Sequence, residues 1–152
     1  MAFVLGALAL TAVGCGAQGH ANDPRPSPPT RVSVTVTRDK VTVQPNRIGL
    51  GPDRTQQIPQ NQSHPQPPIR TNGPLTVAFV TANLTRFDSH LEVHGPRNAT
   101  SEPLVANGAV TLQAELPTGI YRISAADIPG AKPAQLAVGP YRASSQNDVL
   151  LP

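Results

Sequence analysis

Apolar and polar residues alternate along several parts of this chain, and alternation with a period of two is typical of half-buried β-strands. The clearest example is RVSVTVTRDKVTV, residues 31–43, in which Val32, Val34 and Val36 alternate with serine and threonine. The pattern predicts a strand whose valines face a core. The polar Arg38-Asp39-Lys40 segment predicts a turn or bulge, after which the alternation resumes.

The second half of the chain contains short apolar segments separated by turn residues at intervals of about ten to fourteen residues. We predict strands over residues 75–83, 89–95, 109–116, 119–126 and 134–139. Turns are predicted at Asn83, Gly95-Pro96, Asn107-Gly108, Pro117-Thr118-Gly119 and Pro129-Gly130. The spacing predicts an all-β fold, an antiparallel Greek-key β-sandwich of about seven strands over residues 31–140. The residues expected in or near its core are Val34, Val36, Val77, Phe79, Leu91, Val93, Leu112, Tyr121 and Ile123.

Composition supports a small β-domain. The 152 residues include 18 prolines and 12 glycines, which are poor in helix interiors. There is no tryptophan, and only two tyrosines and three phenylalanines are present, so the core must consist mainly of valine, leucine, isoleucine and alanine. The length leaves room for one domain.

The N-terminal segment MAFVLGALALTAVGCGAQG is apolar and uncharged up to Val13. As a helix it would span about 20 Å, short of a hydrocarbon core of about 30 Å, which favours a signal peptide over a membrane span. Its ending, Ala12-Val13-Gly14-Cys15, resembles the bacterial lipobox, although Ala12 stands where leucine is usual and no basic residue follows Met1. The resemblance implies a signal peptide over residues 1–14 and a lipidated Cys15 that carries a palmitate-type acyl chain. The alternative is an ordinary apolar segment with an incidental cysteine.

Three segments do not follow a strand pattern. Residues 15–30 are rich in proline and form a predicted linker, which in polyproline II conformation would reach about 45 Å. A stretch rich in proline and glutamine predicts a solvent-exposed insertion at about residues 56–68, where His64 lies. The C-terminal tail, residues 141–152, has no pattern that assigns it a partner.

Four pieces of the chain between Arg31 and Gly139 resemble the cupredoxin-like family of extracytoplasmic β-sandwiches. They are VSVTVTRDKVTVQPNRI, PLTVAFVTANLTRFDSHLEVHGP, VANGAVTLQAELPTGIYRIS and PGAKPAQLAVG. In copper-binding members the metal is bound by a histidine before one strand, together with a cysteine, a histidine and usually a methionine in a later loop. The resemblance places the first histidine at His90 and the cysteine at about Ala125 or Ala126. The loop ADIPGAKP contains no such donor, so the resemblance implies the fold without a type 1 copper site. An immunoglobulin-like sandwich is the main structural alternative.

The segment FDSHLEVHGP places His90, Glu92 and His94 on one side of a predicted strand, with Leu91 and Val93 facing the core. In an extended strand His90 and His94 lie about 13 Å apart, too far to bind one ion together. We interpret the three residues as a solvated polar face, with no metal and no cofactor expected. The alternative is a weak copper(II)- or zinc-handling protein that uses His90 with Glu92 or His94.

Other chemistry is excluded on the sequence. A net charge of +3 comes from ten arginines and two lysines that are scattered, so nucleic-acid binding is not expected. Asp88, Ser89 and His90 alternate in direction along a strand and cannot form a triad, and no catalytic motif is present, so we expect no enzyme activity. The sequence therefore predicts an extracytoplasmic binding or structural module, held at the cell membrane by Cys15, whose partner is an envelope protein or polymer.

Overall fold

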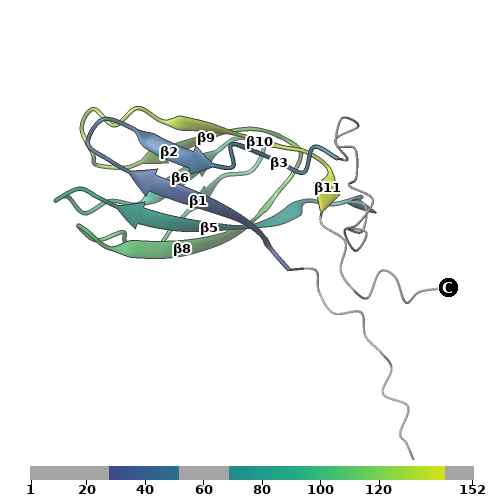
Figure 1. Ribbon diagram of the computed structural model, residues 1–152, viewed down its shortest axis with the longest axis horizontal. Coiled ribbons are helices and arrows are strands. Elements are labelled where there is room, and N and C mark those ends of the chain that lie inside the picture. Colours follow the sequence, from purple (N-terminus) through teal and green to yellow (C-terminus); the bar gives the residue numbers. More distant parts are fainter. Residues whose placement is uncertain (1–27, 52–68, 143–152) are drawn as a thin grey trace, which may run out of the picture.

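The computed structural model describes residues 28–51 and 69–142, which form eleven strands and no helix (Figure 1). The predicted signal peptide, Cys15, the insertion at about residues 56–68 and most of the linker and tail lie outside the described residues. The all-β prediction is confirmed. Two large sheets face each other, and side chains from both form one hydrophobic core.

The first sheet has four strands, and β1 lies inside it between β2 and β5. Its order is β2 (Val41–Gln44), β1 (Thr30–Val36), β5 (Leu75–Asn83) and β8 (Ala109–Leu116). The second sheet has five strands in the order β3 (Arg47–Ile48), β10 (Ala134–Val138), β9 (Gly119–Ala125), β6 (Leu91–His94) and β7 (Ala99–Thr100). A small third sheet pairs β11 (Tyr141–Arg142) with β4 (Ile69–Arg70).

Strand positions follow the sequence pattern more closely than strand pairings do. The predicted strands 75–83 and 109–116 have the bounds observed for β5 and β8. The prediction that all strands pair antiparallel is wrong at two places, because β1 runs parallel to β5 over seven residue pairs and β3 runs parallel to β10. The number of strands exceeds the predicted seven because β3, β4, β7 and β11 have only two residues each, too few for any alternation.

The predicted core is confirmed. Eight of the nine predicted residues are fully or almost fully buried, and Leu112 packs against the cluster from the edge of the first sheet. Tyr121 is the largest buried side chain, and its hydroxyl donates a hydrogen bond of 2.8 Å to the carbonyl of Pro117. Burial raises the pKa of Tyr121 above its ordinary value, against the opposing influence of the Arg97 charge. This tyrosine therefore fixes the turn between β8 and β9.

Asn83, predicted as a turn residue, is a buried junction between two loops. Its side-chain nitrogen donates to the carbonyls of Phe87, Leu104 and Val105 at 2.8, 3.3 and 3.1 Å. Its side-chain oxygen accepts hydrogen bonds from the amide and hydroxyl of Thr85, at 3.0 and 2.8 Å. No part of the residue is exposed. The end of β5 is thus joined to the segments that lead into β6 and β8.

We expect Asn83→Ala to lower the free energy of unfolding by about 2–4 kcal/mol, because it leaves buried carbonyl groups without a donor. Asn98→Ala is the matched control, since Asn98 is exposed and accepts one hydrogen bond from the amide of Gly95. The control should lose about 1 kcal/mol or less. Urea unfolding of both variants measures the difference, and equal losses would contradict a special role for Asn83.

Candidate functional site

Four loops lie together at the end of the sandwich where β1 finishes (Figure 1). The amide of Leu84 donates to the carbonyl of Val36 at 2.9 Å, so the loop after β5 lies beside the end of β1. The amide of Asn107 donates to Thr85 at 3.0 Å, which joins this loop to the one before β8. The amide of Lys132, in the loop between β9 and β10, donates to the carbonyl of Asp39, in the loop between β1 and β2, at 2.8 Å. These are the other two loops of the group. This group is called the loop end, and Thr30, where the chain enters β1, lies at the opposite end.

Three large apolar side chains of the loop end are exposed to solvent. Leu84 is 63% exposed, Phe87 40% and Val105 54%. Their backbones surround Asn83, because Leu84 follows it and the carbonyls of Phe87 and Val105 accept its hydrogen bonds. Binding residues often lie on loops that a rigid scaffold holds in position. We refer to Leu84, Phe87 and Val105 as the loop-end apolar residues.

The conformation of the loop before β8 depends on the backbone conformation of Asn107 and on the small size of Gly108. Asn107 has a φ of 54°, in the left-handed region where asparagine is favoured among non-glycine residues. The amide of Gly108 donates to the carbonyl of Val105 at 3.0 Å, and a Cβ atom at Gly108 would lie 2.4 Å from the Val105 side chain. A larger residue at position 108 would therefore displace Val105. The predicted Asn107-Gly108 turn is confirmed and determines where Val105 is displayed.

Charges at the loop end are balanced. The exposed basic residues are Arg38, Lys40, Arg86 and Lys132, and the exposed acidic ones are Asp39, Asp88, Glu102 and Asp127. The carboxylate of Asp88 accepts a hydrogen bond of 2.8 Å from the amide of Ala106, so it helps to hold the loop before β8 in place. An equal number of both signs does not favour a polyanionic partner.

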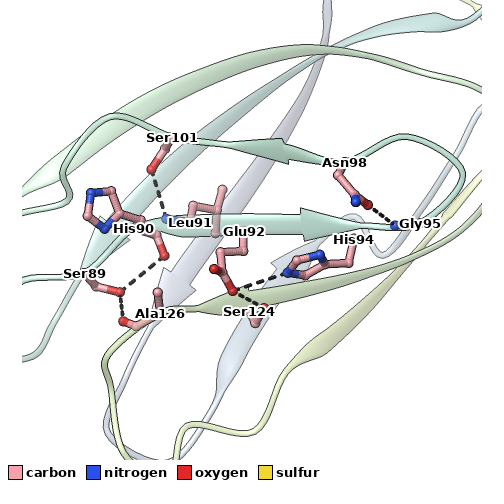
Figure 2. Close-up of polar contacts among 10 residues, drawn as sticks. All are labelled: Ser89, His90, Leu91, Glu92, His94, Gly95, Asn98, Ser101, Ser124 and Ala126. Carbon is pink, nitrogen blue, oxygen red and sulfur yellow. Dashed lines mark hydrogen bonds and ion pairs between the residues drawn. The ribbon is translucent and has the colours of Figure 1, made fainter.

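The structure brings two of the three predicted polar residues together. The His94 ring lies 3.3 Å from the Glu92 carboxylate, which lies 3.3 Å from the hydroxyl of Ser124 on β9. Figure 2 shows the ring of His90 apart from this cluster, at the start of β6. His94 and Glu92 have side chains that are 51% and 35% exposed. They form a polar contact on the outer face of the second sheet.

The surroundings of His90 can be compared with the position that the resemblance assigns to a copper-binding cysteine. The amide of Ala126 donates to the carbonyl of His90 at 2.9 Å, and Ala125 pairs with Leu91. The strand end and loop beside His90 therefore carry alanine at both positions considered for the cysteine. Within residues 28–51 and 69–142, no group of three or more histidine, cysteine, aspartate or glutamate side chains could hold a metal ion.

The side chains of Asp88 and Ser89 bond to backbone groups, and the hydroxyl of Ser89 also reaches the carbonyl of His90 at 3.3 Å. The hydroxyl of Ser89 is buried and donates to the carbonyl of Ala126 (Figure 2), whereas Asp88 caps the amide of Ala106. Nearby, Ser101 accepts a hydrogen bond of 2.9 Å from the amide of Leu91. The two serines hold the start of β6 in place.

Comparison with known proteins adds no identification. The chain matches no protein-family model, and it matches no curated protein. In the part of the chain that the structure describes, no helix is long and apolar enough to cross a membrane.

The loop-end apolar residues were not predicted from the sequence. Each is a single apolar residue inside a segment of turn-forming residues, so none contributes to an alternating pattern. The available signal was their position: Leu84 and Phe87 interrupt the polar run between two strands, and Val105 lies just before Asn107-Gly108.

We expect only weak copper(II) binding to a form of the protein that begins at Pro28, which keeps β1 whole and omits His20. Isothermal titration calorimetry should show the same weak binding for His90→Ala and for the control His94→Ala, because neither removes a formed ligand set. A tight isotherm with one ion per chain, abolished by His90→Ala alone, would instead establish the metal-handling alternative.

Proposed function

We propose that this protein is a lipid-anchored, extracytoplasmic binding module of the cell envelope, with a cupredoxin-like Greek-key fold and without a type 1 copper site or catalytic activity. Its partner is an envelope protein or polymer. The observation that carries the proposal is the display of Leu84, Phe87 and Val105 on loops held by the buried side chain of Asn83.

The strand order supports a cupredoxin-like fold over the immunoglobulin-like alternative. In immunoglobulin constant-type domains the first strand lies at the edge of a sheet, beside the second. Here β1 lies inside its sheet, with β2 antiparallel on one side and β5 parallel on the other. The chain crosses between the sheets at Pro45, since β2 and β3 belong to different sheets.

The proposal includes no type 1 copper site because of the residues that lie around His90. A type 1 site needs a cysteine thiolate. The positions beside His90 are Ala125 and Ala126, and the only cysteine of the chain is Cys15. The two polar residues that follow His90 on β6, Glu92 and His94, contact each other on the outer face of the sheet.

The direction of β1 supports the use of the loop end for binding. A chain anchored at Cys15 enters the sandwich at Thr30, and β1 then runs to Val36, beside Leu84. The loop-end apolar residues therefore lie on the side away from the anchored end of the domain. Such a placement leaves them accessible to a partner outside the membrane.

The anchor is tested by Cys15→Ala. This variant should accumulate as an unprocessed precursor, and membrane-bound protein should shift to other fractions, because the acyl acceptor is lost. Cell fractionation followed by mass spectrometry of the N-terminus measures both effects. Cys15→Ala protein that is processed and membrane-attached like the wild type would refute lipid anchoring.

The binding surface is tested by a photoreactive amino acid at position 87, introduced into the protein in its native cells. We expect a discrete crosslinked product, identified by mass spectrometry as an envelope protein or polymer. The same group at position 120 is the matched control, because Ile120 is also apolar and 62% exposed but lies on β9 outside the loop end. Equal products from the two positions, or none from position 87, would contradict the proposal.

A further inference from the structure

One edge of the first sheet differs from every other edge of the two large sheets. Among the described residues no strand pairs with the outer side of β8. The other three outermost strands are short: β2 has four residues, and β3 and β7 have two each. β8 has eight residues. A long edge strand offers a row of backbone donors and acceptors to another strand.

The hydrogen-bonding register shows which residues of β8 face outward. The amide of Asn83, at the end of β5, donates to the carbonyl of Gly108 at 2.8 Å, so Gly108 faces β5. Backbone groups alternate in direction along a strand, so Val110, Leu112, Ala114 and Leu116 also face β5. Ala109, Thr111, Gln113 and Glu115 therefore direct their N–H and C=O groups to the free edge. The bond of 3.2 Å from the Arg97 side chain to the carbonyl of Glu115 agrees with this assignment.

β8 lacks the features that normally prevent edge pairing. Its sequence, AVTLQAEL, contains no lysine, proline or glycine, and its only charge is Glu115. Glu115 pairs with Arg97 at 3.2 Å in an exposed contact, which costs little to break. The inward side chains Val110, Leu112 and Ala114 are partly exposed at this open side of the core. A strand added at the edge would cover them.

We propose that β8 pairs antiparallel with β8 of a second copy of this chain, with Leu112 on the two-fold axis. In this register Thr111 lies opposite Gln113 of the second copy, and Ala109 lies opposite Glu115. All outward-facing residues then form hydrogen-bonded pairs. The pairing joins two four-stranded sheets into one continuous sheet and leaves the loop end free.

The sequence of β8 favours a second copy as the occupant because it is self-complementary in this register. Val110 lies opposite the smaller Ala114, and Leu112 lies opposite Leu112 of the second copy, so the partly exposed apolar residues of one copy meet those of the other. The two Glu115 carboxylates lie at opposite ends of the strand pair, so like charges are not brought together. A strand edge with a single charge offers little to attract a charged partner. The pairing is independent of the proposed function, since it uses neither the anchor nor the loop end.

The pairing is tested by disulfide formation between two differently tagged full-length chains that carry Cys15→Ser. One chain contains Thr111→Cys and the other Gln113→Cys, and oxidised glutathione is the oxidant. We expect about tenfold more linked heterodimer than when Gln135→Cys replaces Gln113→Cys, because disulfides form only at short Cβ–Cβ distances. Gln135 is also exposed but lies on β10, in the second sheet. Equal yields, or a product formed mainly by Gln113→Cys with itself, would overturn the proposal.

A second measurement uses proline to block the edge. Because the N–H of Gln113 faces outward, Gln113→Pro removes a donor from the free edge and none from the pairing with β5. In the Cys15→Ser background, sedimentation velocity should show loss of the dimer for Gln113→Pro and its retention for Gln113→Thr. A dimer that survives Gln113→Pro, or a wild-type chain that stays monomeric at all concentrations, would also overturn the proposal.

Discussion

Five hydrogen bonds of one buried side chain, Asn83, determine the arrangement of the loop end. A buried amide is costly unless its donors and acceptors are satisfied, and here the surrounding loops supply every partner. The loops after β5 and before β8 can therefore adopt only conformations in which their carbonyls converge on Asn83. The backbone of the same residue also pairs with Gly108, so one position connects the display of apolar side chains to the register of the edge strand β8.

The two outer faces of the sandwich have different chemistry. The second sheet presents Glu92, His94 and Arg122 on neighbouring strands, and Glu92 makes polar contacts with His94 and Ser124. The first sheet presents mostly threonine, serine, alanine and glutamine, with Arg31 and Glu115 as its only charged residues. Sheet faces with few charges resist association less than charged ones do. The open edge of β8 borders this face with few charges, so the same part of the molecule combines free backbone groups with low charge.

The sequence was sufficient to locate the main strands because β1, β5 and β9 each carry valine, isoleucine or aromatic residues at alternate positions. Core membership follows from the same alternation, as Phe79 and Tyr121 show. Pairing was less predictable, since the alternation that buries Val34 is the same whether the neighbouring strand runs parallel or antiparallel.

The candidate site was harder to predict than the strand pairing. Whether an isolated Phe87 is exposed depends on tertiary contacts made by Asn83, and local pattern contains no information about those contacts. His90 illustrates the same limit, because period-two spacing groups it with Glu92 and His94, whereas its ring lies apart from the contact that those two residues make.

The parallel pairing of β1 with β5 has a mechanical consequence. A pulling force that reaches the domain through its N-terminal segment acts at Thr30, along the axis of β1. Interstrand hydrogen bonds lie across that axis, so the bonds on both sides of β1, to β2 and to β5, are loaded together in shear. Extraction of β1 then requires many bonds to break at once and also removes Val32, Val34 and Val36 from the core. A strand at the rim of the sheet would be held on one side only. The central place of β1 therefore gives the sandwich resistance to tension applied through its N-terminal segment.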